Sequence, residues 1–201
     1  MFALHNSQCL PMRPTAFLTD LQQRLASLDA TLHQELLPLP EAVLNHKQSP
    51  ESWSVLECLE HLNRYGRYYL PALQRALGHP EAASKPEEEV GFSWLGRKSY
   101  ELVRPENRKA QKTLSRMNPA RSHLTPAVLQ EFEAQLAAWS SLLPLAAQAN
   151  LNRKAVPVEF FRLLKLRVGE ALLFVVAHMQ RHVQQAQRAA VISVQPQPQL
   201  K

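Results

Sequence analysis

The stretch Trp53-Ser54-Val55-Leu56-Glu57-Cys58-Leu59-Glu60-His61-Leu62 carries the clearest structural signal in the chain. Ser54 and Glu57 have the Ser-x-x-Glu spacing of a capping box, in which each side chain accepts from the other residue's backbone N–H at the start of a helix. Trp53 and Cys58 stand where a hydrophobic staple would fix the entry of the chain. An apolar stripe continues at helical spacing to the stop signal Gly78-His79-Pro80. The sequence therefore predicts an amphipathic helix from about Ser54 to Leu77.

Three further segments show the same helical spacing. Leucines recur every three or four residues from Thr15 to Leu36, and Pro38 and Pro40 end that pattern. A third helix is expected after Thr125-Pro126, with Thr125 as N-cap, and Pro144 kinks or ends it. The fourth is expected from Val158 or Leu163 to Ala190. Strand-like alternation is confined to the short stretch Val191–Val194, so we expect an all-α fold, a four-helix bundle.

The expected bundle occupies residues 15–192, with short tails on both sides. Residues 1–14 and 193–201 carry prolines and polar residues without a helical stripe, so we expect both tails to be dispensable and the second to be disordered. Residues 79–125 form a long connector between the second and third helices, which permits a crossover. We expect that this connector either contains a short helix around Lys109–Arg116 or partly covers a site.

Composition narrows the class of protein. The chain has 201 residues, a formal net charge of +6 and two cysteines, which are too few for a disulfide framework. We find neither a signal peptide nor an apolar run long enough to span a membrane, and we expect a cytoplasmic protein without a membrane partner. Eight of the 23 basic residues lie between Arg97 and Arg121. This cluster is either a solvated connector or the entrance to a site for an acidic ligand or nucleic acid.

Two of the eight histidines have a spacing that suggests chemistry. His178 and His182 are four residues apart, so they project from one side of the fourth helix, within its apolar arc. Buried imidazoles need partners, and such a pair either shares a metal ion or bonds to facing side chains or water. His61 is a third candidate ligand, at the rim of the apolar arc of its own helix. Cys58 could supply a thiolate, although a small buried cysteine is the commoner reading.

Three other polar residues on these two helices are considered as parts of the site. Glu57 could support His61 from outside the ligand set, but the capping box explains it more simply. Gln185 lies beside the histidines on the helical wheel and could orient a metal-bound water. Glu170 is expected at the surface.

Two of these segments resemble the DinB-like (DinB/YfiT) superfamily. Residues 53–62 resemble its W-S-x-x-E-x-L-x-H-L signature, and the stretch from Gly169-Glu170 through His178 and His182 to Gln185 resembles its last helix. The resemblance implies a four-helix bundle with an unusual crossover, in which His61, His178 and His182 hold a divalent metal. It also implies kinship with transferases that use a low-molecular-weight thiol, such as bacillithiol or mycothiol.

Three classes of function are compatible with these features. The first is a metal-dependent thiol transferase or hydrolase that acts on a small molecule, with Zn, Ni, Fe or Mn in the site. The second is a non-catalytic metal-binding stress-response protein. The third, a nucleic-acid binder, rests on composition alone and is not expected. We also expect a homodimer, and loss of metal as the pH falls through about 6, where a free histidine is protonated.

Overall fold

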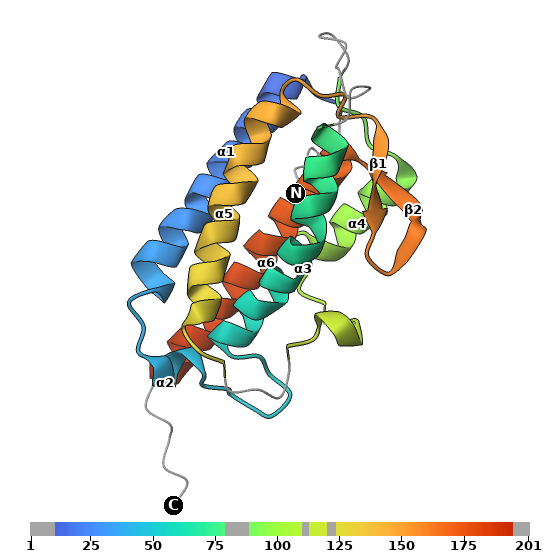
Figure 1. The fold of residues 1–201 in the computed structure, drawn as a ribbon. Helices are drawn as coiled ribbons and strands as arrows, with labels where there is room; N and C mark the ends of the chain where they lie inside the picture. Colours follow the sequence, from blue (N-terminus) through green and yellow to red (C-terminus); the bar gives the residue numbers. More distant parts are fainter. Residues whose placement is uncertain (1–10, 79–88, 110–112, 120–123, 195–201) are drawn as a thin grey trace, which may run out of the picture.

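The computed structural model describes residues 11–78, 89–109, 113–119 and 124–194, and it is mostly helical (Figure 1). The elements, in chain order, are α1 (Pro14–Thr31), the π-helical turn η2 (Leu32–Leu36), α2 (Glu41–Leu44), α3 (Val55–Leu77), α4 (Trp94–Val103), the 3₁₀ turn η4 (Ser115–Met117), α5 (Ala127–Ala146), β1 (Lys154–Val158), β2 (Phe161–Arg167) and α6 (Val168–Val194). The expected tails reach residues 1–10 and 195–201, which lie outside the described part.

The four long helices α1, α3, α5 and α6 form the bundle. Helix α3 packs against α5 and α6, and α1 packs against the same two helices. Figure 1 shows α3 and α5 running in one direction and α1 and α6 in the opposite one. The all-α class and the bundle are therefore confirmed.

The chain between α3 and α5 reaches both ends of the bundle. Near its start, Val90 donates a backbone hydrogen bond to Met12 O, just before α1. Near its end, Leu124 and the side chain of Asn45 exchange two hydrogen bonds beyond α2. Within the described residues of this connector the α-helix is α4. The helix expected around Lys109–Arg116 includes residues 110–112, which lie outside the described part, and the described residues 115–117 form the short turn η4. The pairing of Met12 shows that the end of the expected N-terminal tail contacts the domain.

Helix α3 begins as predicted. The Ser54 hydroxyl accepts from the backbone N–H of Glu57 at 3.1 Å, and the Glu57 carboxylate accepts from the N–H of Ser54 at 3.0 Å. Val55, Leu59 and Leu73 of the predicted stripe are fully buried. The capping box therefore sets the first residue of the helix, and the stripe sets the face that it buries.

Helices α1 and α5 differ from the prediction only at their ends. The leucine stripe of the first helix is buried as expected, but its last turn, η2, is π-helical. Helix α5 begins at Ala127 and has no side-chain cap bond, so Thr125 does not act as the N-cap. Pro144 lies inside the last turn of α5, which ends two residues later.

The expected start of the fourth helix is wrong. Residues 154–167 form an antiparallel hairpin, and α6 begins only at Val168. Val156 and Val158 are buried while their neighbours Ala155 and Pro157 are half-buried, which is the period of a strand. β-Branched residues and Pro157 disfavour helix here. Val191–Val194, the stretch with strand-like alternation, belongs to α6.

Glu170 is buried, and not at the surface as expected. Its carboxylate accepts from the backbone N–H of Arg167 at 2.8 Å, at the start of α6, and from that of Ser93 at 2.5 Å, at the start of α4. A Cβ atom on Gly96 would lie 2.3 Å from the carboxyl carbon of Glu170, so glycine permits this close approach. The carboxylate thus caps α6 and fastens α4 to it.

Candidate metal centre

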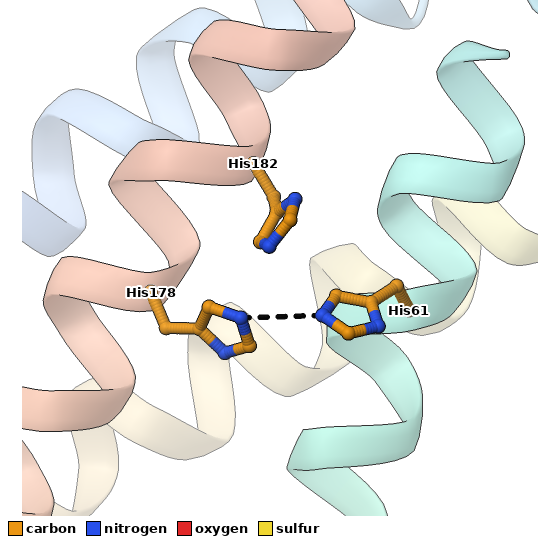
Figure 2. A group of neighbouring side chains, drawn as sticks. All are labelled: His61, His178 and His182. Carbon is orange, nitrogen blue, oxygen red and sulfur yellow. Dashed lines mark hydrogen bonds between the residues drawn. The ribbon is translucent and has the colours of Figure 1, made fainter. Parts of the chain in front are cut away.

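Three histidines from two helices meet in the interior of the bundle (Figure 2). His61 comes from the second turn of α3, and His178 and His182 come from successive turns of α6. Their ring centroids are 4.5–5.0 Å apart, and one nitrogen of each lies within 4.8 Å of the other two. The structure therefore brings together the three histidines that the sequence predicts as ligands.

Hydrogen bonds at the outer nitrogens orient two of the rings. His61 Nδ1 lies 2.7 Å from the carbonyl oxygen of Met117, and His182 Nδ1 lies 2.9 Å from Gln185 Oε1. An oxygen that only accepts requires an N–H on each Nδ1. The Nε2 atoms of both rings are then free of hydrogen and available as ligands, which is how metal-binding histidines are commonly held.

Burial keeps the three imidazoles neutral. The exposed fractions are 2% for His61, 5% for His178 and 9% for His182. Burial lowers the pKa of His61 to about 4, and the charge of Arg64 acts in the same direction. Burial, followed by the neighbouring histidines, holds the pKa values of His178 and His182 well below the usual range, with Arg181 contributing to both. The neutral ring is the form that binds a metal ion.

The spacing of the donors fits a transition-metal ion. The Nε2 atoms of His61 and His178 are 3.2 Å apart. Two nitrogens bound to one tetrahedral ion at about 2.0–2.1 Å would be about 3.3 Å apart. Imidazole donors suit Zn, Ni, Fe and Mn to different degrees and disfavour Ca and Mg. His61 and His178 therefore have the separation that a tetrahedral ion requires, and a nitrogen of His182 lies within 4.8 Å of both donors.

Aromatic rings surround the histidines. Trp53 packs against His61 and His182, with centroid distances of 4.8 and 5.6 Å. Tyr65 packs against His178 at 4.4 Å. The phenol groups of Tyr65 and Tyr69 donate to Glu159, a buried carboxylate at the turn of the hairpin, at 3.3 and 2.5 Å. A small cavity of about 10 Å³, room for about one water molecule, lies between Tyr65 and His178.

A segment of the connector covers the site. Met117 of η4 is buried and supplies the carbonyl bonded to His61. Arg64 donates to the carbonyl oxygens of Arg116 and Asn118, and Arg181 donates to that of Lys109. This cover explains why His61, expected at the rim of an apolar arc, is almost fully buried.

The other candidates lie outside the histidine group. Cys58 is fully buried, and burial raises the pKa of its thiol above the usual range, so it remains a neutral core residue. Glu57 is used by the capping box and by an ion pair with Lys47. Gln185 was expected to orient a metal-bound water, and in the structure its side-chain oxygen accepts a hydrogen bond from Nδ1 of His182. His33 bonds to Glu133 on the surface of the bundle. His5, His79 and His123 lie outside the described residues.

Sequence reasoning missed Met117, Glu159 and the role of Tyr65. Met117 acts through its backbone, which no residue pattern reveals. Glu159 is 90 residues from its partner Tyr69 and was assigned to the start of a helix. Trp53 is predicted from the sequence only as part of a hydrophobic staple, but it also packs against His61 and His182. Its position at the start of the helix that carries His61 is the one sequence feature that could have indicated this contact.

Comparison with family models identifies the superfamily of this chain. A family model described as the DinB superfamily matches residues 20–186, which include α3, α5, most of α1 and α6, and the three histidines. No curated protein and no solved structure matches the chain.

Proposed function

The chain belongs to the DinB superfamily, and from this premise we propose that it is a divalent-metal-dependent enzyme, a thiol S-transferase or a hydrolase. His61, His178 and His182 would hold the ion. The substrate would be a small molecule, and the nucleophile a low-molecular-weight thiol or water.

The orientation of the three imidazoles carries this proposal. Three neutral nitrogen donors leave at least one coordination position open, as catalytic zinc sites do, whereas structural sites use four protein ligands. A bound divalent ion lowers the pKa of a coordinated thiol or water and so supplies a nucleophile near neutral pH. The metal could be Zn, Ni, Fe or Mn.

The surrounding residues would bind and orient the reactants. Trp53 forms an aromatic wall beside His61 and His182, which excludes water and offers an apolar contact. Arg64 and Arg181 place positive charge near the histidines. That charge would attract an anionic thiol cofactor and favour the thiolate over the thiol.

A second candidate function, a non-catalytic metal-binding protein, is favoured by one observation. The histidines are nearly inaccessible, and the cavity beside them holds about one water. In the catalytic case the segment around Met117 must open to admit a substrate. In the non-catalytic case the ion stabilises the bundle and the cover stays closed.

Turnover with defined metals distinguishes the two functions. The purified protein would be stripped of metal, reloaded with Zn, Ni, Fe or Mn, and assayed with several low-molecular-weight thiols and an electrophilic acceptor. The proposal predicts metal-dependent thiol conjugation or hydrolysis that His178→Ala abolishes and His33→Ala leaves intact. Metal that raises the melting temperature without any turnover would favour the second function.

We also propose that the protein is a cytoplasmic homodimer. The described residues contain no helix long and apolar enough to cross a membrane. Large apolar side chains outside the β1–β2 hairpin, among them Leu102, Leu145 and Val191, remain exposed, which is typical of proteins with a partner surface. A monomeric mass by light scattering at micromolar concentration would contradict the dimer.

A further inference from the structure

The β1–β2 hairpin exposes apolar side chains that a folded domain normally buries. The exposed fractions are 60% for Phe160, 47% for Phe161, 83% for Leu163 and 39% for Leu164. Together with Arg162 and Lys165, which are also exposed, these residues form what we call the hairpin patch. Figure 1 shows the hairpin standing on the side of the bundle, away from α1 and α5.

The strand pairing is irregular at the patch. Pro157 pairs with Lys165, but the next residue, Val158, pairs with Phe161. Residues 162–164 therefore have no partner on β1 and form a bulge. Helix α4 packs against β2 and adds another exposed aromatic residue, Trp94, at 74% exposure. Because the hairpin projects from the side of the bundle, these exposed apolar residues lie on a projecting element (Figure 1).

The exposed charges of the hairpin are all positive. Lys154, Arg162 and Lys165 are exposed. The only acidic residue of the hairpin, Glu159, is buried and accepts from Tyr65 and Tyr69. These two hydrogen bonds connect the turn of the hairpin to α3 and so hold the hairpin patch in a fixed position on the bundle.

We infer that the hairpin patch docks the protein onto an anionic lipid surface. Aromatic and leucine side chains enter the boundary between lipid headgroups and acyl chains, while arginine and lysine contact anionic headgroups. A protruding patch suits a deformable surface better than the flat or concave face of a protein. The exposed charges of the patch all have the same sign, which favours an anionic partner over a second copy of the same patch.

The hairpin replaces the start of the fourth helix that the sequence predicts at Val158 or Leu163. In a helix, the apolar side chains of these residues would belong to the core, and the sequence predicts no membrane partner. Peripheral docking through the hairpin patch is independent of the metal-dependent activity.

Sedimentation with vesicles tests the proposal on the full chain. We expect binding to phosphatidylcholine vesicles that contain phosphatidylserine, little binding to pure phosphatidylcholine, and release at high salt. Leu163→Ser removes the most exposed apolar side chain and should weaken binding about tenfold. Arg162→Gln with Lys165→Gln should weaken it about 25-fold, at about fivefold for each charge.

Matched variants control for general loss of charge or of surface leucine. Leu145→Ser removes a leucine of 55% exposure from α5, and Arg13→Gln with Arg188→Gln removes two exposed charges elsewhere. Both controls should bind vesicles like the unaltered chain. Absence of binding to anionic vesicles at low salt, or equal losses in the controls, would overturn the proposal. So would a Leu163→Ser variant that changes from dimer to monomer while its vesicle binding is unaltered, because the patch would then be a contact between copies.

Discussion

Replacement of Gln185 by leucine should weaken metal binding without unfolding the bundle. Gln185 Oε1 accepts from Nδ1 of His182 at 2.9 Å, and this bond selects the tautomer whose Nε2 can bind a metal. Leucine keeps the helix propensity and the approximate volume, but it cannot accept a hydrogen bond. Because Gln185 is half-buried on α6, the change should have little effect on the stability of the metal-free protein.

The expected loss of affinity is 10- to 100-fold, the range for partners that hold a ligating histidine. It corresponds to about 1.4–2.7 kcal/mol of binding free energy. Competition against a chromophoric chelator measures the affinity for Zn²⁺ directly. Gln184→Leu is the matched control, because Gln184 is the exposed neighbour. Equal affinities for Gln185→Leu and the unaltered chain, or equal losses in both variants, would refute the assigned role of this hydrogen bond.

Three further perturbations test the packing and the protonation state. Gly66→Ala should lower the free energy of unfolding in urea by about 1–3 kcal/mol, because the added Cβ atom would lie 1.7 Å from Gln135 Oε1. A second substitution, Gln135→Ala, should restore most of this loss. Glu170→Ala should lower the free energy of unfolding by about 2–4 kcal/mol, because it leaves two backbone N–H groups without an acceptor, whereas Glu51→Ala at an exposed position should cost little. His61 alone should contribute up to about 3 kcal/mol to the stability of the metal-free protein as the pH rises from about 4 to 6.5, because the unfolded chain binds the His61 proton throughout this range and the folded chain does not. The pKa values of His178 and His182 are lowered as well, so the gain should be smaller in His61→Gln than in the unaltered chain, and not absent. An identical pH profile for the two proteins would contradict the role of burial.

The low pKa of His61 also changes one expectation from the sequence. Metal loss was expected as the pH falls through about 6, the range of a free histidine. Because burial disfavours protonation of all three rings, the metal should instead be retained below that pH.

The parts of the fold that follow from local sequence were predictable. The capping box of Ser54 and Glu57 involves residues three positions apart, and the apolar arc that holds His178 and His182 is a property of one helix. Both are present in the structure. The placement of His61 beside them could be expected only from the resemblance to a family, since α3 and α6 are far apart in the chain.

The features that were missed depend on distant contacts. Residues 158–167 contain enough apolar residues for a helix, and their pairing with β1 decides the outcome. Glu170 has the sequence context of a surface residue, yet the N-terminus of α4 approaches it through Gly96. The carbonyl of Met117 reaches His61 across 56 positions, and a backbone group leaves no mark in the sequence.

The metal content of single-histidine variants tests the central claim most directly. Metal-free protein would be titrated with Zn²⁺, and the bound equivalents measured for the unaltered chain and for His178→Ala, His182→Ala and His33→Ala. We predict one equivalent per chain for the unaltered protein and for His33→Ala, and no stoichiometric binding for His178→Ala or His182→Ala. One equivalent bound by His178→Ala with unchanged affinity would contradict the claim, and the three histidines would then be ordinary residues of the core.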